Sequence, residues 1–182
     1  MEDAASGTKI AEDKLEAAME AGLIQDAVIA QNETQAAEIM ALRENMSAAQ
    51  KHYSGSVKLD ITVPIDKIPE FLSRASKATQ TVTRNCRPIP FGHFGDGNIH
   101  YNVAQPEDME RDVYLDKHWH PLSNCVFDIV DSLGGSISAE HGIGTMKKDD
   151  LSVRADPSKV AMLRSIKAAI DPQNIMNPRV LV

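Results

Sequence analysis

The stretch that decides the fold is Phe91-Gly92-His93-Phe94-Gly95-Asp96-Gly97-Asn98-Ile99-His100. Its Asp96-Gly97 pair is a hairpin signal, because a two-residue type I′ turn needs positive φ at both central positions. A turn at these two residues sets His93 directly opposite His100. Directly opposed residues have Cβ atoms about 5 Å apart on one face of the sheet. The stretch therefore predicts a β-hairpin that carries two neighbouring imidazoles.

The predicted pair of histidines provides half of a metal site, because both imidazoles can reach one ion at about 2.1 Å. A second segment reads Ser136-Ile137-Ser138-Ala139-Glu140-His141-Gly142-Ile143-Gly144. Here Glu140 can complete a His₂Glu set that leaves open positions for substrate, and His141 can act as a general base. Two alternatives stay open: two histidines near a turn also occur by chance, and Glu140 could cap a helix that starts near Thr145.

The rest of the chain alternates helical and strand patterns around these segments. Four helical patterns are capped or stopped by Gly22, Asp66, Gly134-Gly135 and Asp156, and a further helix has no such signal. The few strands, the single hairpin and the lack of repeated βαβ units predict one α+β domain over residues 1–182, with an antiparallel sheet covered by helices. The expected helices cover 8–22, 34–51, 66–82, 107–133 and 157–170, and the expected strands cover 27–30, 57–63, 89–94 and 98–104.

Composition excludes some functions for the 182-residue chain. A net charge of −7 argues against a nucleic-acid partner, which needs clustered Lys and Arg. No apolar run approaches the roughly 18 residues that a transmembrane segment needs. The two cysteines, Cys86 and Cys125, lack a CxxC spacing and are expected to be reduced thiols. Together with an acidic amino terminus, these features predict a cytoplasmic protein.

The two segments, with Ile175-Met176-Asn177-Pro178 near the end, resemble the carboxy-terminal domain of FAD-linked oxidases of the vanillyl-alcohol oxidase type. Similar proteins include D-lactate, glycolate and D-2-hydroxyglutarate dehydrogenases. The resemblance implies a ferredoxin-like α/β sandwich, an FAD cofactor and a divalent metal, usually zinc. It also implies that His93, His100 and Glu140 bind the metal and that His141 is the catalytic base.

The resemblance further implies a substrate site. Arg43 would hold the substrate carboxylate, Lys58 and Asn102 would line the site, and Ser47 stands where relatives carry a threonine. Taken alone, Arg43 fits an ion pair with a nearby acid and Lys58 fits a solvated strand face. Asn177 would contact the flavin, although Arg179 and Val180 stand where relatives have the Gly and Lys of Asn-Pro-Gly-Lys.

These roles combine into one reaction on a small 2-hydroxy acid. The carboxylate would bind to Arg43 and Lys58, and the hydroxyl would bind to the metal. His141 would take the hydroxyl proton while the C2 hydride passes to the flavin, giving a 2-oxo acid. An acceptor other than oxygen or NAD, which the sequence does not name, would then take the electrons.

The start of the chain departs from the resemblance. Family members begin with a separate FAD-binding domain and a strand before the first helix, and this sequence has no Gly-rich phosphate-binding loop. We therefore expect a fragment that lacks its FAD-binding domain, is inactive alone and self-associates through an uncovered sheet edge. Two other functions are weighed: a stand-alone metal-dependent hydrolase, which the lack of a His-Glu-x-x-His helix weakens, and a non-catalytic binding domain that retains the fold.

Overall fold

The computed structural model describes residues 2–181, with the side chains of residues 7–50 and 52–181. The chain forms two compact units, Met1–Ala49 and Gln50–Val182. The prediction of one domain over residues 1–182 stays a prediction, and each unit is described by itself below.

The first unit consists of helices. Helix α1 spans Glu2–Glu20 and is followed by Gly22 in the left-handed region, as expected for a helix stop. Helix α2 spans Glu33–Glu44, and the side chain of Asn32 caps it. Helix α3 spans Met46–Ala49, so the single helix predicted over 34–51 is divided.

The strand predicted at residues 27–30 is wrong. These residues are irregular, and the side chain of Val28 is 78% exposed. A four-residue apolar run does not by itself distinguish a strand from other structure, and here it pairs with none of the described strands.

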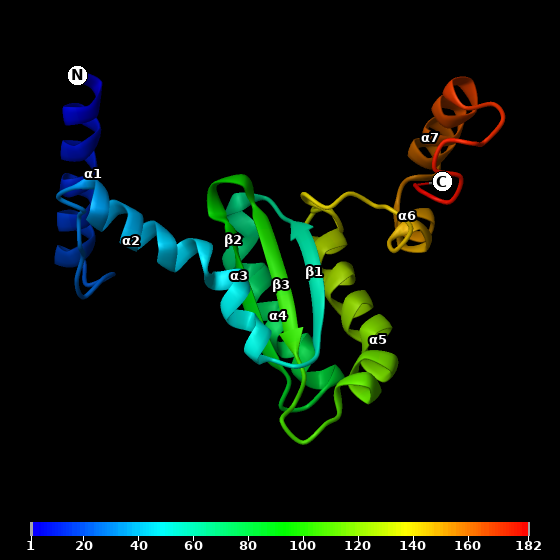
Figure 1. Cartoon of the computed structure of the whole chain (residues 1–182), viewed down its shortest axis with the longest axis horizontal. Coiled ribbons are helices and arrows are strands. Elements are labelled where there is room, and N and C mark those ends of the chain that lie inside the picture. The colour runs from blue at the N-terminus through cyan, green and yellow to red at the C-terminus, as the bar shows by residue number, and fades with distance from the viewer. Residues whose placement is uncertain (1, 182) are drawn as a thin grey trace. The chain divides into compact units, whose positions relative to one another are not determined.

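The second unit is built on a three-stranded antiparallel sheet with the order β1-β3-β2 (Figure 1). This arrangement confirms the predicted α+β class. Its elements in chain order are the 3₁₀ helix η1 (Gln50–His52), β1 (Ser56–Thr62), η2 (Ile65–Lys67), α4 (Ile68–Val82), β2 (Arg87–His93), η3 (Phe94–Asp96), β3 (Asn98–Ala104), α5 (Arg111–Ser132), α6 (Lys148–Arg154) and α7 (Pro157–Ile170).

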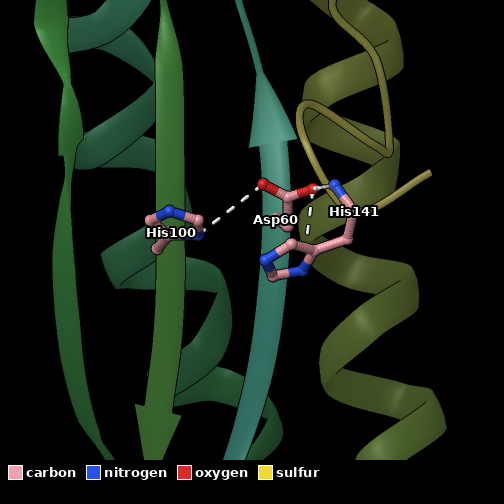
Figure 2. Close-up of side chains that lie close together, drawn as sticks. All are labelled: Asp60, His100 and His141. Carbon is pink, nitrogen blue, oxygen red and sulfur yellow. Dashed lines mark hydrogen bonds and ion pairs between the residues drawn. The ribbon is translucent and has the colours of Figure 1, made fainter. Parts of the chain in front are cut away.

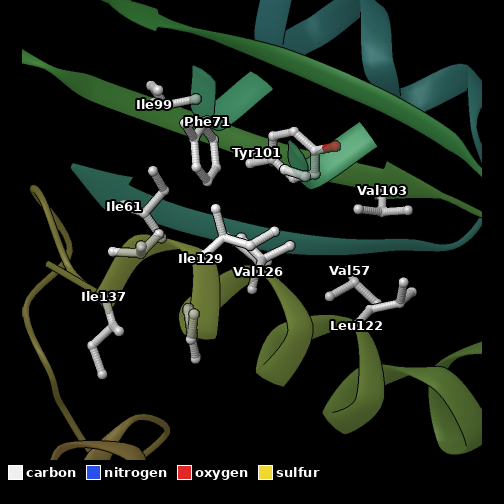
Figure 3. Packing of buried hydrophobic residues seen from close by; sticks show 14 of the residues in the cluster. Val57, Ile61, Phe71, Ile99, Tyr101, Val103, Leu122, Val126, Ile129 and Ile137 are labelled. Carbon is white, nitrogen blue, oxygen red and sulfur yellow. The ribbon is translucent and has the colours of Figure 1, made fainter. Parts of the chain in front are cut away.

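The core lies between one face of this sheet and helices α4 and α5 (Figure 3). Because strand side chains alternate between faces, β1 and β3 direct every second residue into the core. Phe71 of α4 meets Tyr101 of β3 edge to face, with ring centroids 5.4 Å apart. The fully buried side chains include Val57, Ile61, Val103, Leu122, Val126 and Val130. The opposite face carries most of the polar residues of the strands, together with Ile89 and Phe91.

The predicted two-residue turn is wrong. The chain reverses through η3 and Gly97, which follows it, and among residues 94–97 only Gly97 has positive φ (69°). A Cβ on Gly97 would lie 2.1 Å from the carbonyl oxygen of Val63, so only glycine fits there. The longer turn pairs His93 with Asn98 and Phe91 with His100.

The helix starts were predicted with mixed success. Asp156 caps α7 as expected, because its carboxylate accepts a hydrogen bond of 2.7 Å from the N–H of Ser158. Asp66 caps no helix: it lies in η2, and α4 starts at Ile68 without a side-chain cap. Pro121 lies inside α5, which is one continuous helix.

Two predictions about the whole chain can be compared with the structure. Cys86 and Cys125 are free thiols, as expected. Within residues 2–181, no helix combines the length and the apolar character needed to cross a membrane. The predicted cytoplasmic location stays a prediction.

Asp171 fixes the segment that follows α7. Its buried carboxylate accepts hydrogen bonds from the Nζ of Lys167 and from the N–H groups of Ile175 and Met176, the last two at 2.9 Å. The hydrogen bond from Lys167 is the main cause that lowers the pKa of Asp171 below its ordinary value of 3.8, and the desolvation of the carboxylate opposes this shift.

We expect Asp171 to make the stability of this segment acid-sensitive. A lowered pKa means that the carboxylate stabilises the folded state above about pH 4, and that this stabilisation is lost as pH falls through the folded-state pKa. The melting temperature of the native chain should therefore drop more steeply below pH 4 than that of Asp171→Asn. Asp116→Asn, which removes an exposed carboxylate, should follow the native curve. Parallel curves for the native chain and Asp171→Asn would contradict this role.

Candidate functional site

The polar face of the sheet gathers most of the predicted site residues of the second unit. The β1-β3-β2 pairing places three rows of residues across this face. The rows are Thr62, Asn98 and His93; Asp60, His100 and Phe91; and Lys58, Asn102 and Ile89.

His93 and His100 lie on the same face although their predicted pairing is wrong. The true pairing is shifted by two residues from the predicted one, and an even shift keeps each side chain on its face. The two histidines are therefore diagonal neighbours, which stand about 7–8 Å apart in a sheet, and not directly opposed.

Glu140 fills the gap between the two imidazoles. Its Oε1 lies 3.3 Å from Nδ1 of His93, and its Oε2 lies 3.8 Å from Nε2 of His100. Asn98, which is buried opposite His93 and two residues before His100 on β3, donates a hydrogen bond from its amide to Oε1 of Glu140. The three side chains predicted to bind a metal are thus brought together.

Asp60 lies next to this cluster and is 2% exposed. Its Oδ2 accepts hydrogen bonds from three successive backbone N–H groups, those of Ala139 (3.1 Å), Glu140 (2.9 Å) and His141 (2.9 Å). Its Oδ1 lies 3.6 Å from Nδ1 of His100, and Oδ2 lies 3.8 Å from Nδ1 of His141 (Figure 2). One carboxylate therefore contacts both the histidine of the strand and the loop that carries Glu140.

The loop of residues 137–147 and Ser136, which precedes it, are also held to β1 at two other places. Thr62 and Ser136 exchange backbone hydrogen bonds of 2.9 and 2.8 Å. Lys147, largely buried, donates from Nζ to the carbonyl oxygens of Asp60 (3.1 Å) and Ile137 (2.8 Å). A Cβ on Gly135 would lie 2.2 Å from the carbonyl oxygen of Thr62, so this close approach requires glycine.

The charges of Asp60 and Lys147 compensate each other in part. Burial alone raises the pKa of Asp60, but the N–H groups of His141 and Glu140 and the nearby charges of His141 and Lys147 outweigh it and lower that pKa. Burial lowers the pKa of Lys147, and the charges of Asp60 and Asp150 oppose that shift. The site thus keeps a buried negative charge at Asp60.

A cavity of about 520 Å³ lies beside the cluster, between β1, α5 and the 141–147 loop. Two predicted site residues, Lys58 and His141, line it together with Asp60 and Lys147. Its apolar walls come from side chains that include Trp119, Phe127, Ile143 and Met146. The cavity therefore combines positive charge, an imidazole and apolar surface, as a site for a small organic anion requires.

Two overlapping donor sets could hold a divalent cation. The first is the predicted set of His93, His100 and Glu140. In the second, ligand atoms of Asp60, His100 and His141 all lie within 4.8 Å of one another. Imidazole nitrogens and carboxylate oxygens are the donors that zinc prefers, so the residues present fit such an ion.

The other predicted residues occupy different places. Arg43, at the end of α2, and Ser47, in α3, belong to the first unit. Asn102 is buried and donates to Oε1 of Gln50 at 2.6 Å. Asn177 is exposed in the tail, and its carbonyl oxygen accepts from the N–H of Val180 at 3.1 Å. Their roles in binding substrate or flavin stay predictions.

The sequence offered a weak signal for the residues that were missed. Asp60, Asn98 and Lys147 were not predicted as site residues. Aspartate and asparagine are depleted in strands, so Asp60 and Asn98 inside β1 and β3 are unusual. The alternative role for Glu140, as the cap of a helix near Thr145, is wrong, because α6 starts at Lys148 without a side-chain cap.

Fold and site together define an α+β domain with a histidine–carboxylate cluster on the open face of its sheet. Comparison with known families is consistent with this class. Residues 2–181 match the family described as FAD linked oxidases, C-terminal domain. The chain belongs to this family, as its segments at 91–100 and 136–144 suggested.

Curated relatives agree with the family. The D-2-hydroxyglutarate dehydrogenase of Stutzerimonas stutzeri is 36% identical over 160 residues, which are 88% of this chain and 34% of that protein. Its counterpart in Xanthomonas citri pv. viticola is 34% identical over 163 residues, 90% of this chain and 34% of that protein. The mitochondrial enzyme of Arabidopsis thaliana is 33% identical over 170 residues, 91% of this chain and 29% of that protein. The chain thus spans about a third of the length of these relatives.

Proposed function

We propose that this chain is the substrate- and metal-binding part of an FAD-dependent dehydrogenase that oxidises a D-2-hydroxy acid to the 2-oxo acid. The observation that carries the proposal is the meeting of His93, Glu140 and His100 beside a cavity lined by Lys58 and His141. The names of the relatives, D-2-hydroxyglutarate dehydrogenases, favour that hydroxy acid as the substrate.

The residues of the chain would bind the substrate and move one proton. Lys58 would attract a substrate carboxylate, since it is an exposed cation at the wall of the cavity. His141 faces Asp60 with Nδ1, which leaves Nε2 as the atom that would take the hydroxyl proton. The negative charge of Asp60 would stabilise the imidazolium that results.

His93, His100 and Glu140 would hold the cation, which we propose to be zinc. A divalent cation bound there would serve as a Lewis acid that favours loss of a proton from the substrate hydroxyl. The set of three protein ligands with room for a fourth is typical of catalytic zinc sites.

Two cavities of the described residues, of about 550 and 520 Å³, do not fit a whole FAD molecule. They are lined without a Gly-rich phosphate-binding loop, and Asn177 is the one described residue for which a flavin contact is predicted. The flavin would therefore be bound mainly by another domain.

We expect the zinc-loaded chain to bind D-2-hydroxyglutarate more tightly than glutarate, which lacks the hydroxyl. Lys58→Ala should weaken D-2-hydroxyglutarate binding about tenfold at low salt, because it removes a charge-assisted contact with a carboxylate. Isothermal titration calorimetry with and without zinc measures both effects.

The matched control is Lys67→Ala, which removes a half-exposed lysine of η2 that lies 3.8 Å from Asp66. Its affinity for D-2-hydroxyglutarate should equal that of the native chain. Equal affinities for D-2-hydroxyglutarate and glutarate in the presence of zinc would argue against the proposed substrate site. An affinity for D-2-hydroxyglutarate that Lys58→Ala leaves unchanged would argue against it as well.

A further inference from the structure

We propose that Asp60 is the positioning residue of the site: its Oδ2 fixes the loop that carries Glu140 and His141, and its Oδ1 orients His100. This inference rests on the proposed function only where it concerns the cation. The contacts of Asp60 with the loop and with His100 are features of the chain itself.

The backbone of the loop that carries Glu140 and His141 is oriented by Oδ2 of Asp60. Residues 137–147 lie outside helices and strands, so no regular ladder orients Glu140 or His141. Three consecutive N–H groups, at residues 139–141, converge on the one oxygen. Three donors on a single carboxylate oxygen set the backbone direction over these residues, and the two side chains then leave toward the sheet and toward the cavity.

The same contacts argue against Asp60 as a ligand through Oδ2. Its lone pairs already face three N–H donors, and Nζ of Lys147 lies 4.0 Å away. A cation at Oδ2 would displace these donors and meet the positive charge of Lys147. A cation held by Asp60, His100 and His141 would therefore have to use Oδ1 of Asp60.

The second carboxylate oxygen of Asp60, Oδ1, orients the imidazole of His100. Oδ1 is buried, has no hydrogen-bond partner in the part of the chain that the structure describes, and lies 3.6 Å from Nδ1 of His100. A carboxylate beside Nδ1 favours the hydrogen on that nitrogen, which leaves the lone pair of Nε2 free. Nε2 is the nitrogen that faces Glu140, at 3.8 Å from Oε2. Asp60 therefore directs the metal-binding nitrogen of His100 toward Glu140.

Asp60→Asn tests the orientation of His100. The variant has the shape of Asp60, and its single carbonyl oxygen can still accept from the three loop N–H groups. Its amide then faces Nδ1 of His100 and favours the tautomer with the hydrogen on Nε2. We expect the ¹⁵N shifts of His100 to reverse between the two nitrogens in the metal-free chain. Zinc affinity should fall about 10- to 100-fold, as for other residues that orient a ligand.

Asp60→Ala tests the hold on the loop. Amide hydrogen exchange at residues 139–141 of the metal-free chain should become at least about tenfold faster, because their common acceptor is lost. Asp66→Asn is the control, since it removes an exposed carboxylate at the same end of β1. It should leave the exchange rates, the His100 shifts and the zinc affinity unchanged.

The outcomes separate this inference from the proposed function. Unchanged exchange at 139–141 in Asp60→Ala, or native ¹⁵N shifts of His100 in Asp60→Asn, would overturn the positioning role while the cation site could stand. A native chain that binds no zinc would overturn the cation part of the proposed function. The exchange rates and ¹⁵N shifts would still decide the role of Asp60, because neither measurement needs the metal.

Discussion

Glu140→Gln is expected to lower the zinc affinity of the chain by more than about 100-fold. Glu140 is the side chain that contacts both His93 and His100, at 3.3 and 3.8 Å. Replacing residues that only orient a metal ligand already costs 10- to 100-fold, and the loss of a charged ligand should exceed this. Competition with a chromophoric chelator measures the affinity.

His141→Ala gives this prediction its contrast. The alternative set of Asp60, His100 and His141 requires the imidazole of His141 and does not use Glu140. If the predicted set binds the cation, zinc affinity falls in Glu140→Gln and in His93→Ala but stays within about threefold of native in His141→Ala. The reverse pattern, a large loss in His141→Ala and none in Glu140→Gln, would assign the ion to the alternative set.

The control for a lost surface histidine is His120→Ala. His120 is exposed in α5, outside both donor sets. Its zinc affinity should match that of the native chain, which excludes non-specific binding as the source of the signal. A loss in His120→Ala similar to that in His93→Ala would mean that the measured zinc is not held at the proposed site.

The hairpin shows how far the sequence could lead to the site. Because side chains alternate between the two faces of a sheet, any shift of the pairing by an even number of residues keeps His93 and His100 on one face. The two histidines therefore remain close together although the predicted turn is wrong. The register itself follows from the length of the turn. Gly97 takes the left-handed conformation but Asp96 does not, and the close approach of Gly97 to Val63 involves a distant segment. Local sequence therefore indicated the face but not the pairing.

The role of Asp60 shows where sequence reasoning stops. The alternating pattern of 57–63 correctly places Asp60 on the polar face of β1, but a polar face suggests exposure. Asp60 is buried because a loop about 80 residues later covers it and donates three hydrogen bonds. Such a contact depends on tertiary structure, and only the atypical aspartate inside a strand hinted at it.

Phe71→Ala is expected to destabilise the second unit by about 3–5 kcal/mol. Phe71 is fully buried in α4, and its ring meets Tyr101, which lies in β3 between His100 and Asn102. Truncation removes the edge-to-face contact and leaves a cavity beside the sheet. Trp119, the single tryptophan, lies in α5, so its fluorescence during urea unfolding reports on this unit.

Phe71→Ala also tests whether the two faces of the sheet have separate roles. Core residues and site residues alternate along β3, so a change on the core side should lower stability and leave the ligands of the other face in place. We expect near-native zinc affinity wherever Phe71→Ala is still folded, whereas Glu140→Gln should lose zinc with little change in the stability of the metal-free chain. Phe94→Ala removes a ring that is 62% exposed and should change stability by less than about 1 kcal/mol. A folded Phe71→Ala variant that loses zinc as severely as Glu140→Gln would show that packing of the core and geometry of the site are coupled through β3.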